Sequence, residues 1–247
     1  MTINRNIRVF VDNNLSRGMK IILPERLSHY LCSVMRCKAG ERIKCFNNHS
    51  GEFFCSIDIS DKKATTIEVK DKFRDTEIVA DLWLLFSPLK KDRTDFVIEK
   101  SVELGVSKII PVRTERTNSE KIKLERFIAQ SIEASEQCGR LSIPEITNSV
   151  SLNDLLLSGD GGRTLFFMDE RRKGEDIIPL FKQYKGMPAA ILIGPEGGFS
   201  DEEAKQINSF VFVKNVSLGP RILRAETAAT ASLALWQAAA GDWQEGE

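Results

Sequence analysis

Residues 191–200 read Ile-Leu-Ile-Gly-Pro-Glu-Gly-Gly-Phe-Ser, and residues 217–228 read Ser-Leu-Gly-Pro-Arg-Ile-Leu-Arg-Ala-Glu-Thr-Ala. Each stretch follows an apolar run and leads into a helical pattern, so we interpret both as loops between a strand and a helix. Ser200 and Glu203 have the S-x-x-E spacing of a capping box, which predicts that a helix begins there. Open α/β sheets bind ligands at the loops that follow their parallel strands. The two loops therefore predict the fold class and mark a candidate site.

The residue types in these loops limit the choice of ligand. No Gly-Lys-Ser/Thr follows the glycines, and their spacing is not G-x-G-x-x-G, so neither a nucleoside triphosphate nor NAD is indicated. Together the loops offer backbone groups, some apolar side chains and few charges, which suits a neutral heterocycle such as adenine better than a phosphate. A tight turn without a ligand explains a single glycine-rich loop equally well. Glu226, in a first helical turn, also suits the helix dipole without any function.

Strands and helices alternate from about residue 79 to the end of the chain. The expected strands cover residues 82–86, 108–112, 165–168, 189–193 and 210–216, and the expected helices cover 94–104, 121–138 and 226–240, with a further helix beginning near Ser200. This alternation predicts a mostly parallel sheet covered by helices. The last helix is apolar or small on every face, so it is expected to be buried inside the domain or against a second subunit.

The first 72 residues have a different pattern and a different charge. Period-two alternation predicts strands at residues 8–11, 19–23, 42–46, 52–57 and 66–69, with one helix over residues 24–35. We therefore divide the chain into a small β domain, residues 1–72, and an α/β domain, residues 73–247. The first carries 13 Lys+Arg and 8 Asp+Glu, a net charge of +5, and the second carries 22 and 27, a net charge of −5. The basic domain is predicted to meet a polyanion such as RNA.

Composition excludes several classes of protein. The 247 residues include 42% hydrophobic residues, which a disordered chain lacks. The longest uncharged stretch, residues 227–241, is too short for a membrane-spanning helix. The five cysteines show no C-x-x-C spacing, and with only two histidines they indicate no metal site. No signal peptide is visible, so the chain is expected to be cytoplasmic, with its cysteines reduced.

The paired loops closely resemble those of the SPOUT-class methyltransferases of the RsmE type, which methylate N3 of a uridine in ribosomal RNA. The resemblance extends to residues 90–106 and 133–140, which are similar to two helices of that family, and to residues 29–36, which are similar to its N-terminal PUA-like module. It implies a PUA-like β-barrel followed by a SPOUT domain with a deep trefoil knot. It further implies S-adenosylmethionine as the cofactor, a homodimer, and a uridine of small-subunit (16S) ribosomal RNA as the substrate.

The chemistry that the resemblance implies assigns roles to charged residues of the second loop. Uracil N3 carries a proton at neutral pH, so the enzyme must remove that proton and favour the resulting anion. Arg221 and Arg224 are the candidates to stabilise the anion at O2 and O4. Glu226 is the candidate proton acceptor, with Glu196 as an alternative that instead only shapes its loop. The base must be unpaired or flipped out, because N3 lies on its Watson–Crick edge.

The remaining candidates are contacts to cofactor and RNA. The predicted cofactor residues are Met168, Ile193, Gly194, Pro195, Glu196, Gly197, Gly198, Leu218, Gly219, Ile222 and Leu223. The predicted RNA contacts are Arg8, Lys20, Arg36 and Lys44 in the basic domain, with Lys90, Lys91, Arg93 and Arg140 as a second cluster. Two other functions remain open at this point, a SPOUT tRNA ribose 2′-O-methyltransferase and a non-catalytic module that binds adenosine or RNA.

Overall fold

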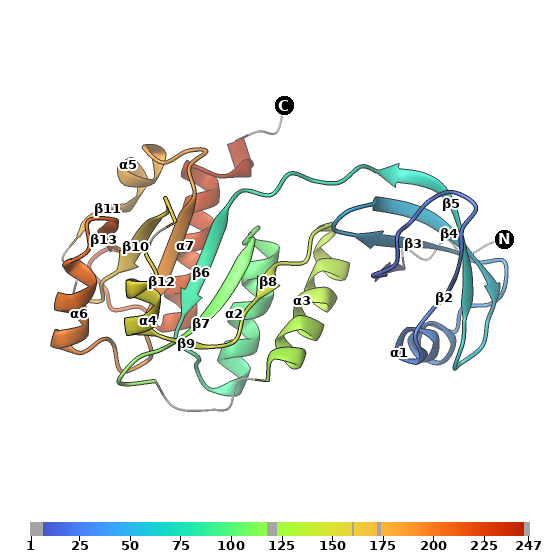
Figure 1. Cartoon of the computed structure of the whole chain (residues 1–247), viewed down its shortest axis with the longest axis horizontal. Helices are drawn as coiled ribbons and strands as arrows, with labels where there is room; N and C mark the ends of the chain where they lie inside the picture. The colour runs from blue at the N-terminus through green and yellow to red at the C-terminus, as the bar shows by residue number, and fades with distance from the viewer. Residues whose placement is uncertain (1–6, 118–122, 160, 172–173, 245–247) are drawn as a thin grey trace. The chain divides into compact units, whose positions relative to one another are not determined.

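The computed structural model describes residues 7–117, 123–159, 161–171 and 174–244. Contacts between residues divide the chain into two compact units (Figure 1). Unit 1 contains residues 1–78 and 135–143, and unit 2 contains residues 79–134 and 144–247. The first unit therefore extends beyond residue 72, where the sequence analysis placed the boundary, and it includes a distant segment that local patterns do not assign to it.

Unit 1 is built on a five-stranded sheet with the order β1-β3-β4-β5-β2. Its strands are β1 (Arg8–Phe10), β2 (Lys20–Ile22), β3 (Arg42–Asn47), β4 (Gly51–Ile59) and β5 (Thr66–Arg74). Strand β1 pairs with β3 in parallel, and the other pairs are antiparallel. The predicted helix over residues 24–35 forms as α1 (Glu25–His29), followed by a π-helical turn (Tyr30–Val34). All five predicted strands of the basic region are thus confirmed.

The core of unit 1 follows the period-two pattern of its strands. Ile43, Cys45, Cys55, Ile57 and Ile67 are buried together, because alternate side chains of each strand point to the same face. All five cysteines of the chain are free. A hydrogen bond to Cys55, together with burial, raises the pKa of the Cys45 thiol well above its ordinary value. This thiol therefore stays protonated and packs as a small hydrophobic side chain.

Arg8 attaches residues 135–143 to the sheet of unit 1. Its Nε donates to Glu52 at 2.5 Å, and Nη1 donates to the carbonyl groups of Ser135 and Glu136 at 2.8 and 2.9 Å. Nη2 donates to the carbonyls of Gly139 and Arg140 at 3.3 and 3.1 Å. These carbonyls lie at and just beyond the end of α3 (Leu124–Cys138), where a helix leaves acceptors unpaired. Arg8 is therefore a structural residue whose donors are already used.

Unit 2 contains a parallel sheet with the order β11-β13-β10-β12-β6-β7-β8, and β9 pairs with β7. Its strands are β6 (Leu82–Phe86), β7 (Lys108–Arg113), β8 (Glu145–Ile146), β9 (Val150–Ser151), β10 (Thr164–Met168), β11 (Glu175–Asp176), β12 (Ala189–Ile193) and β13 (Val213–Ser217). The predicted parallel sheet is confirmed. The predicted strand at 210–216 begins only at Val213, because the chain turns at residues 209–212.

Helices cover both faces of this sheet. They are α2 (Lys91–Glu103), α3, α4 (Leu152–Leu157), α5 (Ile177–Lys182), α6 (Asp201–Asn208) and α7 (Ala225–Ala239), with a short 3₁₀ turn (Asp242–Gln244). Leu84 and Ile191 pack toward the face with α2, α5 and α7, whereas Leu85 and Leu192 pack toward the face with α4 and α6. Both cores are apolar, so the strands are buried on both sides, as in α/β proteins. Figure 1 shows α2 and α7 side by side along one face.

The order of the strands bears on the expected knot. The chain runs from β6 outward through β7 to β8, and later returns to insert β12 between β6 and β10. A strand inserted between two earlier ones requires the chain to reverse direction within the sheet, which places a topological switch point beside β12. The deep trefoil knot that the resemblance implies stays a prediction.

Each helix in the described ranges lacks the length and apolar character that a membrane crossing needs.

Candidate functional site

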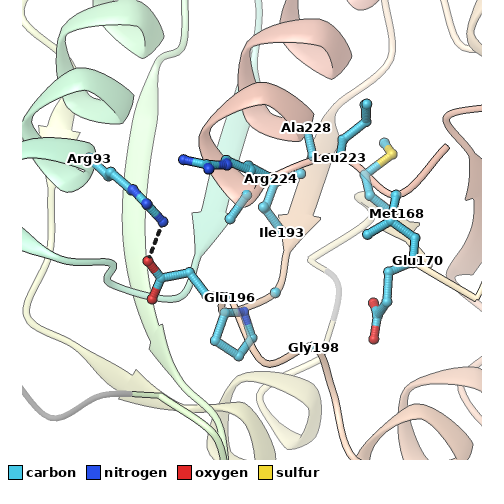
Figure 2. Close-up of a pocket in the computed structure, with 13 residues that line it drawn as sticks. Arg93, Met168, Glu170, Ile193, Glu196, Gly198, Leu223, Arg224 and Ala228 are labelled. Carbon is cyan, nitrogen blue, oxygen red and sulfur yellow. Dashed lines mark hydrogen bonds and ion pairs between the residues drawn. The ribbon is translucent and has the colours of Figure 1, made fainter.

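A pocket of about 250 Å³ opens at the carboxyl ends of β10 and β12 and beside the start of α7 (Figure 2). It is lined by Arg93, Met168, Glu170, Ile193, Gly194, Pro195, Glu196, Gly198, Ile222, Leu223, Arg224, Ala225 and Ala228. A smaller hollow shares five of these residues and adds Asp169, Leu218, Gly219 and Arg221. The structure thus brings the two loops together around one cavity. Of the predicted cofactor residues, Gly197 alone lines neither hollow.

Steric constraints fix the shape of the first loop. A Cβ on Gly194 would lie 2.6 Å from the ring of Phe199, so no side chain fits there. Gly198 has a φ of +68°, and a Cβ on it would collide with the carboxylate of Glu170. That carboxylate accepts a hydrogen bond of 3.0 Å from the backbone N–H of Phe199. Gly197 differs, because its Cβ would meet only Arg116, at an ordinary 3.5 Å.

The end of this loop is held by the capping box that the sequence predicts. The Glu203 backbone N–H donates to the Ser200 hydroxyl at 3.2 Å, and the Ser200 N–H donates to the Glu203 carboxylate at 3.0 Å. The other oxygen of Glu203 accepts from the backbone N–H of Glu115 at 2.7 Å. The loop therefore enters α6 in one defined direction, which orients its backbone groups toward the pocket.

Arg93 and Glu196 both line the pocket, and Arg93 also contacts Glu226, which lines neither hollow. Nη1 of Arg93 lies 2.6 Å from Oε1 of Glu196, and its Nε lies 3.6 Å from Oε1 of Glu226. Figure 2 shows Arg93 directed at Glu196, with Met168 and Leu223 on the opposite side of the cavity. The sequence analysis placed Arg93 among the RNA contacts. The structure instead engages its guanidinium within the pocket, because the first turn of α2 lies beside the first loop.

Glu226 has one oxygen without a partner. Its Oε2 is buried and accepts no hydrogen bond from the described residues. An unpartnered buried acceptor costs about 1–3 kcal/mol, so a ligand that brings a donor to this oxygen gains that amount. Glu196, by contrast, is exposed and already accepts from Arg93. The geometry therefore distinguishes the two carboxylates that the sequence left as alternatives.

Arg221 and Arg224 lie at the edge of the cavity. Both are exposed, with Arg224 immediately before α7 and Arg221 at the smaller hollow. In the described part of the chain neither forms an ion pair with a carboxylate, so both charges are available to a ligand. Positive charge fixed at such a place stabilises negative charge that develops in a reaction.

The residues that follow β10 were missed by the sequence analysis. Asp169 is buried and accepts three hydrogen bonds from Arg171, two from the guanidinium at 2.8 and 2.9 Å and one from the backbone N–H at 3.0 Å. This pairing raises the pKa of Arg171. Glu170 reaches the first loop, as described above. The signal that would have found these residues is the same rule that located the two loops, because they too follow a parallel strand.

The other predicted RNA contacts are spread over both units. Lys20, Arg36 and Lys44 lie in unit 1, where Lys20 and Arg36 are exposed and Lys44 is half-buried. Lys90 is exposed immediately before α2, and the side chain of Lys91 lies outside the described residues.

The structure contradicts two of the predicted RNA contacts, because their side chains are buried and do not face solvent where a phosphate could bind. The side chain of Arg8 is only 7% exposed and that of Arg140 only 8%. Arg140 also donates to the Ser142 hydroxyl at 2.7 Å. Both are buried because the end of α3 and the segment after it pack in unit 1, a long-range contact that local patterns do not reveal.

Comparison with known proteins identifies the family. A model of an RNA methyltransferase domain matches residues 76–237, and a model of an RNA methyltransferase PUA domain matches residues 23–70. The ribosomal RNA small subunit methyltransferase E of Rickettsia conorii is 30% identical over 229 residues, which cover 92% of this chain and 93% of that protein. This chain belongs to the ribosomal RNA small subunit methyltransferase E family. The resemblance on which the sequence analysis relied is confirmed.

Solved structures related to the methyltransferase E family share the fold and carry the cofactor. The ribosomal RNA small subunit methyltransferase E of Neisseria gonorrhoeae, bound to S-adenosyl methionine, superposes with a TM-score of 0.88 at 29% identity and covers 97% of this chain and 100% of its own. A putative methyltransferase of Legionella pneumophila, in complex with the same cofactor, has a TM-score of 0.84 at 30% identity and covers 95% and 98%. The family therefore has a PUA-like domain followed along the chain by a mixed α/β domain.

Proposed function

We propose that this chain transfers a methyl group from S-adenosylmethionine to N3 of a uridine in small-subunit (16S) ribosomal RNA. The observation that carries the proposal is the shared pocket of the two loops, which Arg93 lines and from which it contacts Glu226, whose buried Oε2 has no partner among the described residues. The relative from Rickettsia conorii, a ribosomal RNA small subunit methyltransferase E, supports ribosomal RNA of the small subunit as the substrate, and the S-adenosyl methionine bound in the Neisseria gonorrhoeae protein supports the cofactor. The choice of uridine N3 rests on the resemblance of the loop sequences.

The pocket suits this cofactor in shape and in chemistry. Met168, Ile193 and Leu223 provide apolar surface for a purine ring. At Gly194 and Gly198 the neighbouring side chains leave no room for a Cβ, so the loop presents bare backbone there. Both loops expose backbone groups to the cavity, which can recognise a neutral base by hydrogen bonds. We infer that these residues, with Pro195, Leu218, Gly219 and Ile222, hold the adenosine part of the cofactor. Gly197 is left out of this set because it lines neither hollow.

The residues around the pocket suggest how the proton of N3 is removed. When bound, S-adenosylmethionine supplies an electrophilic methyl group on its sulfonium sulfur. Glu226 would accept the N3 proton at Oε2, which leaves on N3 the electron pair that the transfer of a methyl group requires. Arg93 holds Glu226 in place through Oε1, and Glu196 in turn positions Arg93. Arg221 and Arg224 stabilise negative charge at O2 and O4 of the base.

Product analysis tests this function. The protein is incubated with methyl-labelled S-adenosylmethionine and small ribosomal subunits that lack the modification, and the RNA is digested to nucleosides. The proposal expects labelled 3-methyluridine. Label in a 2′-O-methylnucleoside would show that the enzyme methylates ribose and not uridine N3. The same test with tRNA examines the alternative substrate. Cofactor binding without any transfer of label would leave a non-catalytic module.

A pair of matched variants tests the proton acceptor. Glu226→Gln keeps the size of the side chain but cannot accept a proton, so the methylation rate is expected to fall by about 10²-fold or more. Glu196→Gln, which alters the other carboxylate bound by Arg93, is expected to lower the rate much less. Calorimetry checks that both variants bind S-adenosylmethionine as the wild type does. Full activity of Glu226→Gln would remove Glu226 from the reaction.

The assembly and the setting of the enzyme belong to the same proposal. We infer a homodimer that forms through α7 and acts on RNA within the small ribosomal subunit, in the cytoplasm where that RNA is found. The partly exposed side of α7 beyond its first turn supports the dimer, because it carries Thr230, Ala231 and Ala234 and no charge. Small uncharged residues allow two helices to approach closely.

A further inference from the structure

We propose that unit 1 binds unpaired bases of its RNA through a surface made by Arg42, Lys44, Phe54 and Phe73, here called the aromatic–cation surface. This inference names the place where the RNA of the proposed function is held outside the pocket. The sequence analysis identified Lys44 by its charge alone. In the structure, aromatic rings of two other strands lie beside Lys44.

The four side chains form one continuous group on the outer face of the sheet. Lys44 on β3 lies opposite Phe54 on β4, and the rings of Phe54 and Phe73 are 4.9 Å apart at their centroids. The Arg42 guanidinium carbon lies 4.4 Å from the centroid of Phe54, and the Lys44 ammonium lies 4.1 Å from that of Phe73. Phe73 is 45% exposed, so a large part of its ring meets solvent.

The two cations of this surface differ from other cations of unit 1. Four other cations on the strands of the sheet are paired, Lys20 with Asp58, Lys70 with Glu68, Lys72 with Asp75 and Arg74 with Glu52. Over the residues that the structure describes, Arg42 and Lys44 form no such ion pair. Their charges therefore remain uncompensated next to aromatic rings. A polyanion that also carries planar apolar groups satisfies both features at once.

Single-stranded RNA has that combination of groups. Its phosphates attract Arg42 and Lys44, and its bases stack on aromatic side chains and on guanidinium groups. Paired bases in a duplex are already stacked on one another and do not present a free face. The surface thus fits an unpaired stretch of RNA rather than a helix, which agrees with a target base that must be accessible on its Watson–Crick edge.

Unit 2 offers a matched control. Phe96 on α2 is 41% exposed, and the ammonium of Lys100 lies 5.7 Å from its ring centroid. This lysine, however, is paired with both Glu99 and Glu103. Phe96 and Lys100 therefore repeat the ring and the cation of the aromatic–cation surface without its uncompensated charge.

The test measures the affinity of the full chain for a short labelled oligouridine and for the same strand annealed to oligoadenosine. Phe73→Ala is expected to weaken binding of the single strand at least about fivefold, the effect of one lost stacking contact, and to leave the salt dependence unchanged. Phe73→Leu, which keeps an apolar side chain without an aromatic face, should weaken binding similarly. Lys44→Gln should instead reduce the salt slope by roughly 0.7. Phe96→Ala should bind as the wild type does.

Several results would overturn the proposal. In the first, both Phe73 variants bind the single strand with wild-type affinity. In the second, the Phe73 variants lose as much affinity for the duplex as for the single strand. In the third, Phe96→Ala loses as much affinity for the single strand as Phe73→Ala does. Because Phe73 is exposed, the variants are expected to fold, and thermal unfolding confirms this. The oligonucleotide measurements do not depend on catalysis. A wild type that transfers no methyl group would contradict the proposed function, while the binding data would still decide whether this surface holds RNA.

Discussion

Arg8 and Glu52 show how a charged residue acquires a structural role. Burial alone raises the pKa of Glu52, but hydrogen bonds from Arg74 and Arg8 outweigh it and hold that pKa below the ordinary value of 4.5. The Glu52 side chain is fully buried, so its charge depends on these two arginines. The planar guanidinium of Arg8 also reaches four backbone carbonyls, which the single ammonium group of a lysine cannot do.

We predict that Arg8→Met destabilises the chain by about 3–5 kcal/mol, because it removes one partner of a buried ion pair and leaves carbonyl groups of the α3 end unpaired. Urea unfolding monitored by circular dichroism measures the change. Lys20→Met is the control, since its ion pair with Asp58 is exposed and should contribute little. If the two variants had the same free energy of unfolding, Arg8 would contribute no more to stability than an exposed cation does.

The lowered pKa of Glu52 also predicts a dependence on pH. The unfolded chain takes up a proton at Glu52 at a higher pH than the folded chain does, so this contribution to stability is present above about pH 4.5 and is lost as the pH falls below it. The variant Glu52→Gln lacks this proton uptake. Its free energy of unfolding should therefore fall less steeply below pH 4.5 than that of the wild type, even though the variant is less stable at pH 7. Parallel curves for the two proteins would contradict this account.

Among the elements, the first loop sets the geometry of the site. Gly197 is one of the cofactor residues predicted from the sequence, but the structure shows ordinary space for a side chain there. The constrained positions are Gly194 and Gly198, the one because of the Phe199 ring and the other because of its positive φ and the Glu170 carboxylate.

We predict that Gly198→Ala lowers the affinity for S-adenosylmethionine at least about tenfold. Adopting a positive φ costs a residue with a side chain roughly 1–2 kcal/mol, and the added methyl group also displaces Glu170 from the loop. Gly197→Ala is the control and should bind the cofactor as the wild type does. Calorimetry on both variants gives the comparison. A tolerated Gly198→Ala would mean that the loop adjusts without loss.

The last helix serves the core and, in our proposal, the dimer. Leu233, Trp236 and Gln237 are buried within unit 2, and Gln237 donates to the carbonyl of Leu104 at 2.6 Å. Leu235 packs against the same core, so a charge there would disturb the fold as well as any interface. The partly exposed side that includes Ala231 and Ala234 is the better place to test association.

We predict that Ala234→Arg converts the dimer to monomers, because a long charged side chain separates two closely packed helices. Light scattering coupled to size-exclusion chromatography measures the mass. Ala64→Arg, at an exposed position of unit 1, should leave the dimer intact. A wild type that is monomeric at micromolar concentration would remove the dimer from the proposed function.

At the scale of the whole molecule, opposite charges are divided between its two parts. Residues 1–72 have a net charge of +5 and residues 73–247 a net charge of −5, so the total is zero. With Arg8 buried, the predicted phosphate contacts that remain in this region are Lys20, Arg36 and Lys44. In our proposal, this arrangement separates the attraction of RNA from the chemistry of the pocket.

We predict that replacing Lys20, Arg36 and Lys44 together by Ala reduces the salt slope of RNA binding by roughly 0.7–0.9 for each lost contact, at unchanged cofactor affinity. Titrations with small-subunit RNA at several salt concentrations measure the slope. The matched control replaces Lys182, Lys185 and Lys205, three exposed lysines of unit 2, by Ala. If the control lowers the slope as much, the charge of the whole molecule, and not of unit 1, governs the binding.

Local patterns in the sequence were sufficient for the longer elements and for the two loops that line the pocket. Alternation with period two predicts the strands of unit 1, and the S-x-x-E spacing predicts the start of α6, because these features depend on residues only a few positions apart. The short helices α4 and α5 and the two-residue strands were missed, since such brief segments carry too little periodicity. The loops after β12 and β13 were located because they follow strands, a rule that needs no coordinates.

Roles that depend on distant partners were decided by the tertiary structure alone. Arg93 meets Glu196 across 103 residues of sequence, and Arg8 meets Ser135 across 127, so their charges alone suggested contacts to RNA. The same holds for Phe73, whose neighbours Lys44 and Phe54 lie on other strands. Whether a charged group is exposed or paired depends on which segments pack together. That choice is made by the burial of the whole chain, which no short window of sequence contains.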